Sequence, residues 1–115
     1  SNDSPYGIIG FSNGGYMATK IFSYCLAPRY AQKLNWIVTV GAAKLWGSGK
    51  SRSNLRSCRP ITLVAGKKDT FNYERRQNKF RLLRRKGAKI SVLLFDGGHE
   101  VPYGPLITAL RKYLN

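Results

Sequence analysis

The sequence predicts an α/β fold in which about four parallel strands are flanked by helices. Three observations lead to this class: short apolar runs alternate with helix-like segments, the runs are nearly continuous in apolar residues, and turn residues separate them. Strands that alternate with helices favour right-handed crossovers and therefore a parallel sheet. A chain of 115 residues is long enough for one domain with a proper core.

The first strand is predicted at Tyr6 to Gly10, an apolar run that ends in glycine. A helix is predicted from Gly14 to Leu26, because Met17, Ile21 and Cys25 recur at helical spacing. A proline shortly afterwards closes this helix.

Three further strands are predicted at Asn35 to Val40, Ile61 to Ala65 and Ile90 to Phe95. A helix at Tyr73 to Lys86 separates the last two, and Pro105 to Leu114 forms the final helix, with proline at its start. The positions through which the first of these helices is expected to be buried are Phe80, Leu82 and Leu83.

The pentapeptide Gly10-Phe11-Ser12-Asn13-Gly14 lies between the first strand and its helix. A G-x-S-x-G sequence in that position predicts a nucleophile elbow, a sharp turn that lifts the serine side chain clear of the sheet. Asp69 and His99 each follow the end of a later predicted strand. Ser, Asp and His in this order are typical of an α/β-hydrolase catalytic triad.

His99 is the only histidine, so it must be the base if Ser12 is the nucleophile. If the strands have the order that the resemblance to α/β-hydrolases implies, His99 has to reach back over three strand spacings, about 14 Å, and Gly97-Gly98 supplies freedom for that loop. The imidazole needs a carboxylate to fix its tautomer. The candidate carboxylates are Asp69, which we favour, then Asp96, and then Glu100 and Glu74.

The segment from Gly10 to Ala18 resembles the elbow of esterases in the α/β-hydrolase superfamily, close to polyhydroxyalkanoate depolymerases, feruloyl esterases and dienelactone hydrolase-like members. Gly66-Lys67-Lys68-Asp69 resembles the acid loop, and Gly97 to Pro102 resembles the histidine loop. The resemblance implies ester hydrolysis through an acyl-Ser12 intermediate, with neither metal nor cofactor. It also implies that the backbone N–H of Asn13 contributes to the oxyanion hole.

The resemblance covers nearly the whole chain but only the second half of the family fold. The second oxyanion donor normally comes from a loop upstream of the elbow, yet nine residues precede Gly10. The first strand would then be a bare apolar edge, which proteins rarely tolerate. We therefore expect a single domain, 1–115, that pairs with itself as a homo-oligomer. There are two alternatives. Either another chain or a longer precursor supplies the N-terminal half of the fold, or the chain is a minimal hydrolase.

Twenty Lys and Arg against five Asp and Glu give a formal net charge of +15. This excess favours anionic partners such as nucleic acid, anionic lipid or cell-wall polymers, and equally suits an ordinary solvated surface. An alternative function is therefore an inactive basic module that binds a polyanion. The basic stretch from Lys44 to Arg59 carries Trp46, which we interpret either as a substrate contact at the rim of an open site or as a core residue.

The two cysteines, Cys25 and Cys58, have no metal-binding spacing, and both a disulfide and two thiols fit them. No apolar run approaches the roughly 20 residues of a membrane span. The chain has no signal peptide and does not begin with Met, so a processed form or a fragment is expected, with a secreted or periplasmic location slightly favoured.

Overall fold

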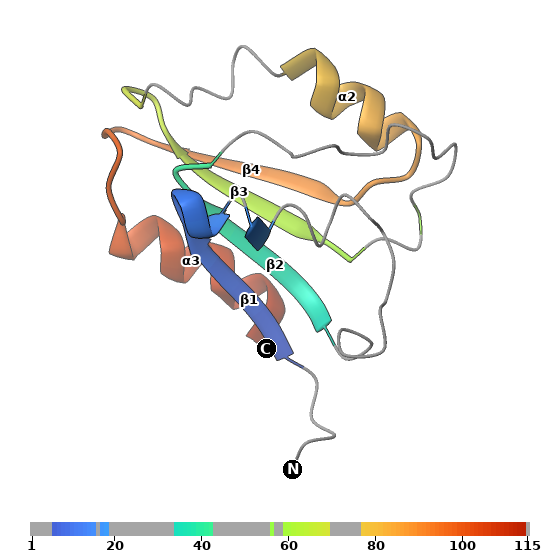
Figure 1. The fold of residues 1–115 in the computed structure, drawn as a ribbon, viewed down its shortest axis with the longest axis horizontal. Helices are drawn as coiled ribbons and strands as arrows, with labels where there is room; N and C mark the ends of the chain where they lie inside the picture. Colours follow the sequence, from blue (N-terminus) through green and yellow to red (C-terminus); the bar gives the residue numbers. More distant parts are fainter. Residues whose placement is uncertain are drawn as a thin grey trace.

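The computed structural model describes residues 6–15, 17–18, 34–42, 56, 59–69 and 77–114. Its sheet has the strand order β1-β2-β3-β4, and every neighbouring pair is parallel (Figure 1). The predicted α/β class with four parallel strands is therefore confirmed. The named elements are β1 (Tyr6–Phe11), β2 (Leu34–Val40), β3 (Ile61–Gly66), α2 (Gln77–Arg85), β4 (Ile90–Phe95) and α3 (Tyr103–Leu114).

The strand boundaries agree with the predictions to within one residue, and the main differences lie in the helices. The α3 helix begins at Tyr103, two residues before the predicted start, and Leu106 N–H already donates to Pro102 O at 2.9 Å. Pro105 is accommodated in the first turn because the N–H that it lacks would have no intrahelical acceptor there. Residues 13–15 and 17–18 are helical, as predicted after the elbow.

The α2 helix buries Leu83, which is 2% exposed, whereas Leu82 is 51% exposed. The prediction that Leu82 is buried is therefore wrong. Consecutive helical residues point about 100° apart, and on this helix Leu83 faces the core whereas Leu82 points away from it. The side chain of Phe80 lies outside the described residues.

The core lies around the two central strands. Every residue of β3 is buried, as expected for a strand covered on both faces. Val38, Val40 and Val64 form one cluster with Ala109 of α3, so this helix covers one face. The alternate residues Ile37 and Leu63 point to the opposite face and are also fully buried. None of the described helices is long and apolar enough to cross a membrane.

Tyr113 fixes the end of α3 to the sheet. Its ring stacks on Trp36 with centroids 5.4 Å apart and planes 6° apart, and its hydroxyl is hydrogen-bonded to that of Thr62. Burial raises the pKa of Tyr113, against a smaller opposing effect of the Thr62 hydrogen bond.

We expect Tyr113 to make the fold sensitive to alkali. A raised folded-state pKa means that its contribution to stability is complete below the ordinary tyrosine value of about 10 and is lost as the pH rises through the folded pKa. Urea unfolding between pH 8 and 11.5 should show a smaller alkaline loss in Tyr113→Phe than in the wild type. Tyr103→Phe, which changes an exposed tyrosine of the same helix, is the control; equal losses in both variants would contradict the prediction.

Candidate active site

Ser12 lies in a sharp turn between β1 and the helical residues that follow. Its φ of +54° is the only positive value at a non-glycine residue in the described part of the chain. Such a conformation costs about 1–2 kcal/mol for an L-residue. The Ser12 N–H donates to Val40 O at 2.8 Å, which joins the turn to the end of β2. These features are those of the predicted nucleophile elbow.

Glycine at position 10 allows the strand and the helix to approach each other. A Cβ at Gly10 would lie 2.4 Å from the carbonyl oxygen of Gly14. No real Cβ contact is that short, and the neighbouring atom belongs to the backbone and cannot rotate away. The strand–turn–helix geometry around Ser12 therefore depends on the first glycine of the pentapeptide.

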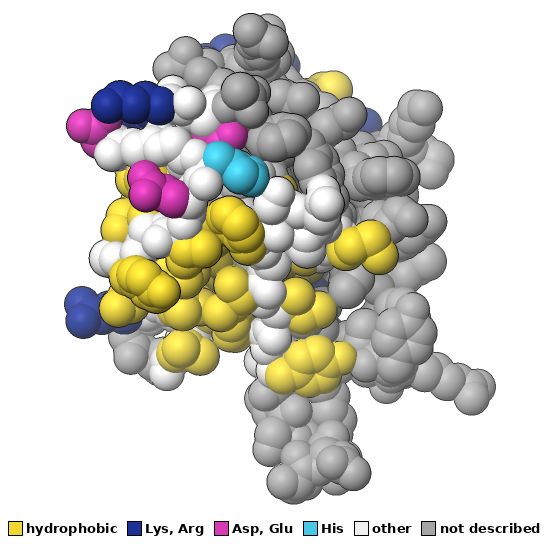
Figure 2. Space-filling model, turned by 60° about the vertical axis from the view of Figure 1, so that its left-hand side comes forward, with side chains coloured by type: hydrophobic (Ala, Val, Ile, Leu, Met, Phe, Trp, Pro, Cys, Tyr) yellow, Lys and Arg dark blue, Asp and Glu magenta, His cyan; other side chains and the backbone are white. Residues whose placement is uncertain are grey.

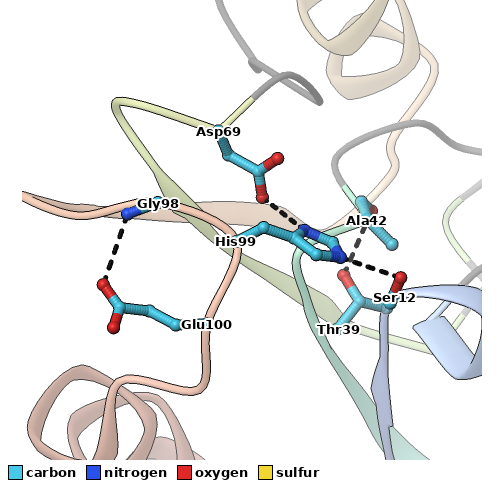
Figure 3. A network of polar contacts seen from close by, with 7 residues as sticks. All are labelled: Ser12, Thr39, Ala42, Asp69, Gly98, His99 and Glu100. Atoms are coloured by element: carbon cyan, nitrogen blue, oxygen red, sulfur yellow. Dashed lines mark hydrogen bonds and ion pairs between the residues drawn. The ribbon is translucent and has the colours of Figure 1, made fainter.

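His99 lies between Ser12 and Asp69 and contacts both (Figure 3). Its Nδ1 is 2.8 Å from Asp69 Oδ2, and its Nε2 is 2.9 Å from Ser12 Oγ. A carboxylate only accepts hydrogen bonds, so Nδ1–H donates to Asp69 and Nε2 accepts the hydroxyl proton of Ser12. The Asp69 side chain is 1% exposed and that of His99 is 37% exposed, so the carboxylate is shielded while the imidazole remains accessible.

The loops that carry Asp69 and His99 are tied together beyond the end of the sheet. Lys67 N–H donates to Phe95 O at 3.0 Å, and Lys68 N–H donates to Gly97 O at 2.9 Å. The turn closes through Asp69 N–H, which donates to Gly66 O at 3.1 Å. Because these bonds extend the pairing of β3 with β4, the positions of the acid loop and the histidine loop are set together.

The other carboxylates considered above have different surroundings. Asp96 lies 3.8 Å from Lys68 Nζ in an exposed ion pair. Glu100 accepts a hydrogen bond from Gly98 N–H at 3.3 Å, which steadies the histidine loop (Figure 3). Glu74 lies outside the described residues. Asp69 is thus the carboxylate that the structure places on the imidazole.

Asn13 begins the helical residues directly after Ser12 and is exposed. The first N–H groups of a helix have no acceptor within the helix, so the Asn13 N–H makes no hydrogen bond inside its own helix. Three sequence candidates, Trp46, Cys25 and Cys58, lie outside the described residues.

Two residues that sequence reasoning did not select border the imidazole. The ring of Phe11 lies 5.1 Å from that of His99, centroid to centroid, at 34°. Gly41 follows β2 with a φ of +70°, and a Cβ on it would be 2.9 Å from His99 Cε1. Two hydrogen bonds hold the turn around Gly41: the Gly41 N–H donates to Val64 O, and the Thr39 hydroxyl donates to Ala42 O. Phe11, at the end of β1, and Gly41, directly after β2, thus border the imidazole of His99.

Gly41→Ala should displace the imidazole more than it disturbs the fold. Alanine adds about 1–2 kcal/mol of left-handed strain and places a methyl group against His99. A displacement near 1 Å can cost about a hundredfold in rate, so we expect serine labelling to slow by that order while most of the protein stays folded at 25 °C. Gly104→Ala, at a glycine with open space around it, is the control. Unchanged labelling in Gly41→Ala would contradict the prediction.

A parallel sheet with Ser12, Asp69 and His99 at the carboxyl ends of its strands defines a small α/β-hydrolase. The model of the serine hydrolase (FSH1) family matches residues 1–108, and the chain belongs to this family. No curated protein matches the chain. The superfamily inferred from the motifs is thereby confirmed, whereas the finer resemblance to particular esterases stays a prediction.

Proposed function

We propose that this serine hydrolase cleaves carboxylic esters through an acyl-Ser12 intermediate. One observation carries the proposal: the unbroken series of hydrogen bonds from Ser12 Oγ through both nitrogens of His99 to the shielded carboxylate of Asp69. A serine hydroxyl is a weak nucleophile until a base removes its proton, and this series supplies both the base and the group that orients it.

The reaction follows from these contacts in two stages. Ser12 Oγ attacks the ester carbonyl while Nε2 of His99 accepts its proton, and Asp69 stabilises the imidazolium that forms. The C–O bond to the alcohol then breaks as Nε2 returns the proton to the leaving oxygen. Water next attacks the acyl-serine with His99 again as base, which releases the acid and restores Ser12.

The negative oxygen of each tetrahedral intermediate needs hydrogen-bond donors that are already in place. In this proposal the backbone N–H of Asn13 is one donor, because it follows the nucleophile directly at the start of a helix. Such a donor typically contributes about a hundred- to a thousandfold in rate.

The first test is the intact mass of the protein after exposure to a fluorophosphonate. We expect one adduct on the wild type and none on Ser12→Ala or His99→Ala. Ser91→Ala, which removes a serine of β4 outside the site, should label like the wild type. A folded wild type that forms no adduct, or an adduct that survives in Ser12→Ala, would refute the proposal.

A second function, binding of polyanions, is favoured by the net charge of +15 and by the exposed Arg81 and Arg85 on α2. Binding to anionic vesicles should fall steeply with salt and be the same in Ser12→Ala. Arg81→Glu combined with Arg85→Glu should weaken it. Binding that does not depend on salt would exclude this function.

A further inference from the structure

Apolar side chains gather on the face of the molecule directly below the histidine (Figure 2). Five large hydrophobic residues from this side of the fold are exposed, by 38% to 77%. We call them the apolar surface: Ile9 and Phe11 of β1, Val101 of the histidine loop, and Tyr103 and Ile107 of α3. None of them is needed for the hydrogen bonds that join Ser12, His99 and Asp69.

The strand register places the β1 members on the face covered by α3. Ile9 is paired with Val38 and Phe11 with Val40, and neighbouring residues of parallel strands point to the same face. Val38 and Val40 pack against α3. Ile9 and Phe11 therefore lie on the same face as α3, at the edge of the sheet that β1 forms among the described strands.

Helical geometry places the α3 members on the flank nearer to β1. Lys112 Nζ donates to Ser91 Oγ of β4 at 2.7 Å, so Lys112 marks the flank nearer to β4. At about 100° per residue, Ile107 and Tyr103 lie about 140° and 180° around the helix from Lys112. They consequently point towards β1, where Ile9 and Phe11 are exposed.

The apolar surface is continuous with the reacting groups. The Phe11 ring contacts the imidazole of His99, and Val101 follows His99 by two residues. In the proposed reaction Nε2 of His99 delivers a proton to the leaving alcohol, so the alcohol must lie on the His99 side of the carbonyl carbon. A group that extends from that oxygen past the imidazole meets Phe11 first, because the Phe11 ring lies against the imidazole.

We propose that the apolar surface binds the alcohol part of the ester, and that the substrates are esters of apolar alcohols. This inference rests on the proposed ester hydrolysis. Each methylene group that moves from water onto such a surface should raise kcat/KM about two- to fourfold, since burial of one CH₂ is favourable. The acyl group, on the other side of the carbonyl, gains nothing from this surface.

Microscopic reversibility adds a second activity. An apolar alcohol bound at the same surface can attack the acyl-serine in place of water: its oxygen forms the new C–O bond and its proton passes to Nε2 of His99. Ser12 Oγ then leaves and takes that proton from His99. The products are a new ester and the free enzyme, so hexanol should intercept the acyl-enzyme better than ethanol does.

The test compares two series of substrates at equal concentration. Ethyl, butyl, hexyl and octyl acetate vary the alcohol, whereas ethyl acetate, butyrate and hexanoate vary the acyl group. We expect kcat/KM to rise with alcohol length and to change less with acyl length. The double variant Val101→Ser/Ile107→Ser should flatten the alcohol series and lower the yield of hexyl ester, with a larger loss of kcat/KM for octyl acetate than for ethyl acetate.

The matched control is Leu82→Ser, an exposed leucine on α2. It should keep the wild-type slope. A flat alcohol series in an active wild type, or the same slope in the double variant, would overturn the inference. Sedimentation measures the oligomeric state of the same proteins. If the wild type is a dimer, the double variant is a monomer, and kcat/KM rises with alcohol length equally in both, then a second copy of the chain occupies the surface instead. Failure of ester hydrolysis itself would show separately, as the absence of cleavage of every ester in both series by a wild type that still forms the fluorophosphonate adduct.

Discussion

Ser12→Ala is expected to lower kcat for ester hydrolysis by about a millionfold, close to the level left by binding alone. His99→Ala should cost about as much, because base and nucleophile act as one unit. The double variant should therefore be little worse than either single variant. Additive losses would mean that Ser12 and His99 do not act in the same step. They would contradict the joint role inferred from the 2.9 Å contact between His99 Nε2 and Ser12 Oγ.

The fold offers a way to separate this loss of activity from a loss of structure. Ser12 has a φ of +54°, and alanine keeps the same left-handed strain, so Ser12→Ala should unfold at the same denaturant concentration as the wild type. Ser12→Gly removes the steric strain, since glycine adopts positive φ readily, and should be at least as stable as Ser12→Ala while equally inactive. A Ser12→Gly protein that is clearly less stable would mean that the turn is not strained.

Much of the fold could be predicted because its signals are local. The continuous apolar runs of β2, β3 and β4 identify buried strands without any knowledge of their neighbours. The G-x-S-x-G pattern predicted the turn at Ser12 for a steric reason. The structure agrees with this reason, because a Cβ on Gly10 would lie 2.4 Å from Gly14 O. The order of serine, acid and histidine then indicated which strand ends would meet.

The parts that could not be predicted depend on contacts between distant segments. Nothing near Gly41 in the sequence shows that the glycine faces His99, because 58 positions separate them (99 − 41). The sequence favoured Asp69 over Asp96, but the reason for the difference is visible only in the loops: the turn from Gly66 shields Asp69, whereas Asp96 is exposed beside Lys68. Phe11 was visible as part of the motif, but its contact with the imidazole required the register of β1 with β2.

Asp69→Asn is expected to lower kcat by about ten-thousandfold near neutral pH, while Asp96→Asn leaves it nearly unchanged. The amide carries no charge and can donate a hydrogen bond to Nδ1, which would place the imidazole proton on Nε2, where Ser12 needs an acceptor. The two variants make the same chemical change just after neighbouring strands, since Asp69 lies three residues after the end of β3 and Asp96 one residue after the end of β4. They differ in exposure, since the Asp69 side chain is 1% exposed and that of Asp96 is 82% exposed. If both substitutions lowered kcat equally, net charge rather than orientation of the imidazole would be the cause, and the role proposed for Asp69 would fail.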